Sequence, residues 1–214
     1  MFLTSAWQAT LDWLLPCYCA GCSRSRVQPN QPFCYQCLSD LNESAYDEQK
    51  QYSNEKMFWG RIPLQTVKTA FPLRSGSILQ HAMHQLKYHH RPGIGTFLGR
   101  LAANSLQSAE RSLDYDALIP LPLHPNKKRK RGYNQAEKIC EGIHSATRIP
   151  IWNDLVLRSR ATETQTKKDR RQRWENMQGK FALQNGSRAI GKHLLLVDDV
   201  LTTGATDRKS TRLN

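Results

Sequence analysis

The chain has 214 residues, which is enough for one α/β domain with a buried core and a small appended module. Its 31 Lys and Arg exceed its 18 Asp and Glu, and the formal net charge of +13 favours polyanionic partners such as nucleotides, nucleic acid or phosphorylated metabolites. The N-terminal stretch has no basic leader and carries Asp12 among its apolar residues, which disfavours both a secretory signal and a membrane span. We therefore expect a cytoplasmic protein. A lipoprotein interpretation of Leu15-Pro16-Cys17 is weaker still, because a small residue is expected before a modified cysteine.

Residues 1–40 are predicted to form a leading helix followed by a metal module. The helix lies behind the caps Thr4 and Ser5 and is stopped by Pro16. Its apolar residues, at helical spacing, are Trp7, Leu11, Leu14 and Leu15. In a reducing compartment the cysteines that follow indicate a metal site rather than disulfides.

Two Cys-x-x-Cys pairs carry the metal prediction. Cys19 and Cys22 form the first pair and Cys34 and Cys37 the second, giving four thiolates that can close a tetrahedral structural zinc site. A set of buried free cysteines is the alternative. Cys17 could replace Cys19 as a ligand, although the regular spacing favours Cys19. A closed four-thiolate site has no open position, so it stabilises the module or presents a binding surface.

Residues 41–61 are polar, mixed in charge and without a sustained period, which predicts a linker. Residues 62–206 then alternate between strand and helix patterns. The predicted strands are Thr66–Pro72, Ala117–Leu121, Leu155–Leu157 and His193–Leu201. The predicted helices have apolar faces within 78–86, 97–102 and 134–147, with a Pro-Gly turn at 91–93 between the first two. This alternation predicts an α/β domain with a largely parallel sheet flanked by helices, whose ligands bind at the carboxyl ends of the strands.

Two further groups of potential metal ligands are given structural interpretations. The histidines at 81, 84, 89 and 90 have no cysteine or carboxylate partner at matching spacing, which favours a solvated helix face. Cys140 lies on the apolar side of a predicted helix and is interpreted as a core residue.

The segment LLLVDDVLTTGAT at 194–206 indicates a phosphoribosyl site. A buried strand would hold Asp198 and Asp199 rigidly at the sheet edge, where they can accept hydrogen bonds from ribose hydroxyls. The following turn offers backbone N–H groups and hydroxyls to a phosphate, and glycine permits its tight curvature. The residues of this turn are Thr202, Thr203, Gly204, Ala205 and Thr206. An ordinary polar turn after a buried strand is the alternative, but it would not need this composition.

The basic excess is concentrated in one region. Residues 124–173 hold 14 Lys and Arg against five Asp and Glu. The densest run is Lys127, Lys128, Arg129, Lys130 and Arg131. With Tyr133 within the region and Trp174 at its edge, it could contact phosphates and stack bases as single-strand binders do, or hold the pyrophosphate of a small ligand.

These patterns resemble known families. The acidic pair and TTGAT turn are similar to the phosphoribosyl-diphosphate signature of type I phosphoribosyltransferases. Further matching pieces identify the ComF/GntX family, which joins a zinc ribbon to such a domain. They are Leu86-Lys87-Tyr88, the strand and loop 119–137 with its RGYNQ segment, Leu157-Arg158, Thr162, Thr164, Gln165, Arg173, Asn176 and Gly179-x-Phe181. The resemblance covers most of residues 11–206 and implies a role in natural competence and use of external DNA.

The resemblance implies two alternative functions. In a working transferase, magnesium on the pyrophosphate and cations of the basic loop would stabilise the leaving group while Asp198 and Asp199 hold the ribose. The rival is a catalytically silent protein that binds single-stranded DNA or a DNA-processing partner through the basic stretch and zinc module. The family continues with an apolar-faced helix, whereas residues 207–214 are mainly polar here, so we expect a truncated or non-native C-terminus.

Overall fold

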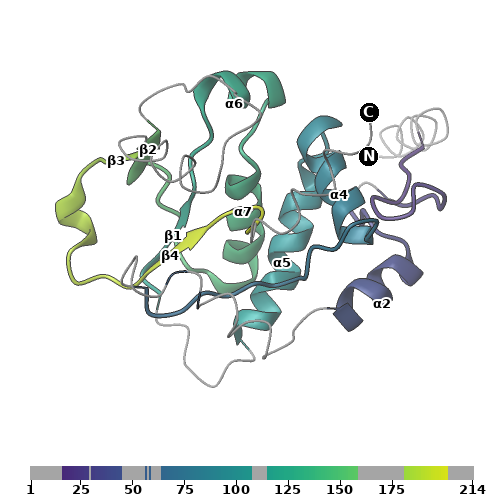
Figure 1. Ribbon diagram of the computed structural model, residues 1–214, viewed down its shortest axis with the longest axis horizontal. Coiled ribbons are helices and arrows are strands. Elements are labelled where there is room, and N and C mark those ends of the chain that lie inside the picture. The colour runs from purple at the N-terminus through teal and green to yellow at the C-terminus, as the bar shows by residue number, and fades with distance from the viewer. Residues whose placement is uncertain are drawn as a thin grey trace, which may run out of the picture.

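The computed structural model describes residues 16–28, 30–44, 56, 58, 64–107, 115–158 and 181–201. Helix α7 (Gln135–Thr147) packs against a small parallel strand pair, and Figure 1 shows α5 (Gly93–Gln107) and α7 side by side, on one side of β1 (Ala117–Pro120) and β4 (Leu194–Val197). The α/β class is therefore confirmed. The leading helix predicted before Pro16 lies outside the described residues.

Side chains cap the starts of two of the helices. Ser77 caps α4 (Ile78–Tyr88) by accepting a hydrogen bond from the Gln80 N–H, and Asn134 caps α7 by accepting one from the Ala136 N–H. The apolar face predicted for α4 is the buried one, comprising Leu79, Ala82, Met83 and Leu86.

Glycine allows α5 and α7 to touch at their backbones. A Cβ on Gly99 would lie 2.1 Å from the Ile139 carbonyl oxygen, and one on Gly142 would lie 2.1 Å from that of Thr96. No other residue leaves this space, so the close approach of the two helices depends on both glycines.

The strands differ in part from the prediction. β1 and β4 are parallel, with Ala117 opposite Leu194 and Pro120 opposite Val197. β4 stops at Val197 rather than Leu201. A separate antiparallel pair joins β2 (Val156–Arg158), near the predicted strand, to β3 (Phe181–Leu183), which was not predicted. The phosphoribosyltransferase-like sheet itself stays a prediction.

The strand predicted at Thr66–Pro72 is wrong. The segment is irregular, and Phe71 and Leu73 pack against the helical core instead of a sheet face. A β pattern becomes a strand only where a neighbour completes its ladder, and no described strand pairs with these residues.

The basic stretch also differs from the predicted loop, because it forms the short helix α6 (Pro125–Arg131). His124 caps its start by accepting a hydrogen bond from the Asn126 N–H, Pro125 occupies its first turn, and Gly132 ends it with a φ of 79°. These start and stop signals outweigh the repulsion within the charge run.

The cysteine segment shares its core with the rest of the protein. Ala20 and Phe33, together with Leu41 of α2 (Tyr35–Ser44), belong to the same buried cluster as Leu86 of α4 and Ile94 of α5. Figure 1 shows α2 at the opposite end of the molecule from β2 and β3. The boundaries at 1–40, 41–61, 62–206 and 207–214 stay a prediction. Among the described helices, none combines the length and apolar character that crossing a bilayer requires.

Candidate functional site

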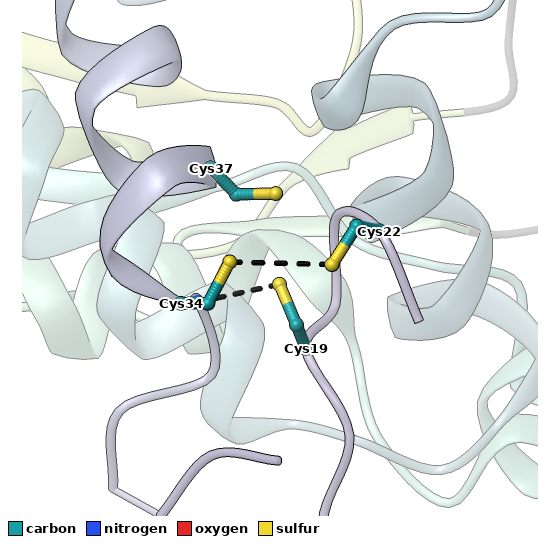
Figure 2. Close-up of side chains that lie close together, drawn as sticks. All are labelled: Cys19, Cys22, Cys34 and Cys37. Atoms are coloured by element: carbon teal, nitrogen blue, oxygen red, sulfur yellow. Dashed lines mark hydrogen bonds between the residues drawn. The ribbon is translucent and has the colours of Figure 1, made fainter. Parts of the chain in front are cut away.

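Four cysteines converge at the N-terminal end of the structure. The Sγ atoms of Cys19, Cys22, Cys34 and Cys37 all lie within 4.8 Å of one another, and Figure 2 shows the four sulfurs facing a common centre. A tetrahedral zinc with Zn–S bonds of about 2.3 Å needs S···S separations of about 3.8 Å. The Cys22 and Cys34 sulfurs, 4.0 Å apart, already approach that spacing.

Local backbone structure aims these sulfurs. A short bridge between Tyr18 and Arg26 closes the loop that holds the first pair, and Ser23 adopts the left-handed region at a φ of 56° to complete its turn. The second pair brackets the start of α2, with Cys37 in its first turn. The Cys19 Sγ accepts hydrogen bonds from the N–H groups of Gly21 (3.4 Å) and Cys34 (3.3 Å), which stabilise a thiolate.

Other backbone N–H groups shift the pKa values of the thiols. Hydrogen bonds from the backbone N–H groups of Ser25 and then Arg24 lower the pKa of Cys22 to about 6, and the Cys37 N–H at the start of α2 lowers the pKa of Cys34. Burial raises the pKa of Cys37. A bound metal would displace the proton of the Cys37 thiol. The four cysteines therefore fit a closed thiolate site whose deprotonation is coupled to metal binding.

The other predicted ligand groups stay apart from this cluster. Cys17 is not a member of the cluster, whereas Cys19 is. Cys140 is fully buried on α7, and its burial raises its pKa to about 12, in agreement with a core role. The four histidines at 81, 84, 89 and 90 are exposed and form no metal-sized cluster within the described residues.

A second group of polar residues lies at the carboxyl ends of β1 and β4. The Leu121 N–H donates to the Val197 carbonyl at 2.8 Å, so the two strands end together. Asp198 and Asp199 follow β4 directly, and α6 follows β1 after a short connection. The predicted acidic pair and the predicted basic run therefore follow adjacent parallel strands at one edge.

The two carboxylates have different surroundings. Asp198 retains an exposed surface, yet the protein atoms around its carboxyl, and then the charge of Asp199, raise its pKa. Its Oδ1 accepts a 2.7 Å hydrogen bond from the Asp199 N–H. Asp199 is half-buried and forms an ion pair with Lys87 of α4, with the Lys87 Nζ 2.9 Å from Oδ2.

Sequence reasoning did not identify Lys87 as part of this group. It was noted as part of a family match, but only the fold places it on the acidic pair. Arg158, at the end of β2, was missed in the same way: its charge affects the pKa of Asp198, and its buried Nε has no hydrogen-bond partner among the described residues. No local pattern would have joined either residue to the acidic pair.

The cations of α6 have different surroundings. Lys127 retains an exposed surface, yet the protein atoms around its ammonium, and then the charges of Arg158, Arg131 and Lys87, lower its pKa, so it lies near these three cations. Arg131 stacks over the Tyr88 ring at 5.6 Å, and its guanidinium donates to the Gln135 Oε1.

The remaining α6 cations are either exposed or already paired with a carboxylate. Lys128 is held by the carboxylate of Glu137 at 2.7 Å. Arg129 and Lys130 are exposed, and in the described part of the chain no carboxylate pairs with them. The predicted phosphate turn, Thr202, Thr203, Gly204, Ala205 and Thr206, lies outside the described residues.

Comparison with curated proteins found several relatives. The chain is 33% identical to DNA utilization protein YhgH of Shigella flexneri over 131 residues, which is 60% of this chain and 57% of that protein. It is 28% identical to Competence protein F of Haemophilus influenzae over 199 residues, 91% of this chain and 82% of that protein. It is 33% identical to Competence protein ComFC of Bacillus subtilis over 89 residues, 42% of this chain and 34% of that protein.

The first of these matches spans little more than half the length of its relative. No protein-family model matches the chain. No solved structure matches it either.

Proposed function

The chain belongs to the ComF family, and from this premise we propose that it binds phosphoribosyl diphosphate, or a related phosphoribosyl ligand, at the edge formed by β1 and β4. The observation that carries the proposal is the ion pair of Asp199 with Lys87 of α4 at the ends of two parallel strands. Arg158 of β2 is close enough for its charge to affect Asp198, and Lys127 of α6 lies near both cations. Carboxylates there suit ribose hydroxyls, and cations suit a diphosphate. The turn 202–206 would receive the 5-phosphate.

Magnesium belongs to the same proposal. It would arrive with the diphosphate, whose oxygens Mg²⁺ prefers to a cage made only of protein groups. If the domain turns over, the cations beside the diphosphate would stabilise the charge of the leaving group. Among the α6 residues, Lys127 and Arg131 would make that contact.

We also propose that the four-cysteine cluster holds structural zinc. The support is the donor set itself, because four convergent thiolates with no carboxylate or water position favour zinc. Bound zinc would brace α4, since the Gln85 side chain donates to the Ala20 carbonyl (3.2 Å) and the Ser23 hydroxyl (3.2 Å) of the cysteine loop. The metal would thus stabilise the helix that carries Lys87.

A second candidate function is binding of single-stranded DNA or of a DNA-processing protein. The names of the relatives, which refer to DNA utilization and competence, motivate it. The specific observation is that Arg129 and Lys130 are exposed on α6, turned to solvent rather than held by a carboxylate of the described residues. Replacing both by Gln should weaken single-stranded DNA binding and flatten its salt dependence; a salt-insensitive interaction would exclude this role.

Titration calorimetry with phosphoribosyl diphosphate and magnesium tests the first proposal. The Asp198→Asn, Asp199→Asn double variant should lose most of the affinity, whereas Lys138→Met, which removes a cation paired with Glu141 away from the edge, should not. Equal affinity in both variants would refute the site. Pyrophosphate release with candidate bases or ammonia then separates a transferase from a binding protein.

A further inference from the structure

Asp199 already has a cationic partner without any ligand. The Lys87 ammonium lies 2.9 Å from its Oδ2, and the two side chains are only 24% and 17% exposed, so the pair is partly shielded from water. In the proposed function, this carboxylate must also accept a ribose hydroxyl. A ribose hydroxyl that takes Oδ2 must therefore displace the Lys87 ammonium.

The backbone that carries Lys87 is held in place. The Tyr133 hydroxyl donates a hydrogen bond to the Leu86 carbonyl, and the Gln85 side chain ties the same turn of α4 to the cysteine loop. Only the flexible stem of Lys87 can move, which lets its ammonium change partners without displacing the helix.

Further cations lie near Lys87. Arg158, Arg131 and Lys87 are all close enough to Lys127 for their charges to lower its pKa. Within the described residues, the Lys87 pair with Asp199 is the one ion pair formed by any of these cations. Among the described residues, the buried Arg158 Nε has no acceptor. An incoming oxyanion would supply one.

Resting on the proposed function, we infer that Lys87 is a positioning residue that exchanges Asp199 for the diphosphate of the ligand. Without ligand, it neutralises the carboxylate. On binding, a ribose hydroxyl takes Asp199, and the released ammonium joins the cations around the diphosphate. No bond is made or broken in this exchange, only one charge-assisted contact for another.

Two probes that differ in the diphosphate test the exchange: phosphoribosyl diphosphate with magnesium, and ribose 5-phosphate. In the full chain, Lys87→Met should weaken binding of the first about tenfold or more. It should leave binding of ribose 5-phosphate unchanged or tighter, because Asp199 is freed. Lys87→Arg should retain most of the affinity for both, and Lys138→Met serves as the control for a lost surface cation.

Asp199→Asn provides the reciprocal test and does not depend on how Lys87→Met folds. It removes a ribose acceptor but frees Lys87, so it should weaken ribose 5-phosphate by a larger factor than phosphoribosyl diphosphate. Equal losses for both probes in Lys87→Met or in Asp199→Asn would overturn the exchange while leaving the binding site intact. Failure of the unaltered chain to bind either probe would instead overturn the proposed function, and the exchange with it.

Discussion

Gly142→Ala is the substitution for which the structure predicts the clearest loss of stability. The new Cβ would lie 2.1 Å from the Thr96 carbonyl oxygen and 2.8 Å from the Arg100 nitrogen. Real Cβ contacts are essentially never shorter than 3.0 Å, so α5 and α7 must separate by nearly 1 Å at this point. Both obstructing atoms belong to the backbone, so no side-chain rotation can relieve the overlap.

Two opposing effects set the magnitude for Gly142→Ala. Overpacking of this kind costs about 1–3 kcal/mol, and the rigid backbone contact places it at the upper end. Alanine returns about 1 kcal/mol through its better helix propensity. The net expectation is a loss of about 2 kcal/mol, or a fall in Tm of roughly 4–8 °C for a chain of this size.

Urea unfolding followed by circular dichroism measures this loss. The matched control is Gly186→Ala, where the nearest atom would be 3.9 Å from the new Cβ, so its stability should change by less than about 0.5 kcal/mol. If Gly142→Ala proved as stable as the unaltered protein, the close packing of α5 on α7 would be wrong.

Three further predictions concern the sites. Cys37→Ser should abolish stoichiometric zinc, measured by metal analysis after purification, whereas Cys17→Ser should retain it; metal loss in both would count against the four-cysteine assignment. Because the pKa of Asp198 is raised in the folded protein, its protonated form contributes stability at low pH, and this contribution is lost as the pH rises through that pKa. Asp198→Asn should therefore increase the urea midpoint at pH 7, with a gain that shrinks towards pH 4. No gain at pH 7 would contradict the crowded setting of this carboxyl. Tyr133→Phe should lower stability by about 1 kcal/mol and weaken phosphoribosyl diphosphate binding, because the Leu86 carbonyl loses its donor next to Lys87; calorimetry and thermal unfolding test both parts.

The features predictable from sequence were those encoded by neighbouring residues. Cysteine pairs three residues apart place two sulfurs on one tight loop or helix start, so the metal cluster could be predicted from spacing. Capping residues and periodic apolar faces fixed α4 and α7 in the same way. The helix α6 had such signals in His124, Pro125 and Gly132, but its run of like charges was interpreted as a loop.

The remaining features depend on partners distant in the chain. Residues 66–72 have the pattern of a strand, yet whether they pair depends on the segments beside them. Phe71 of this range packs against the helical core instead. By contrast, the sequence by itself determined the cysteine cluster and the position of the acidic pair after a buried strand. Only the tertiary structure decided that Lys87 meets Asp199 and that Lys127 lies near Arg158 and Lys87, because contacts between elements depend on how they pack and not on spacing along the chain.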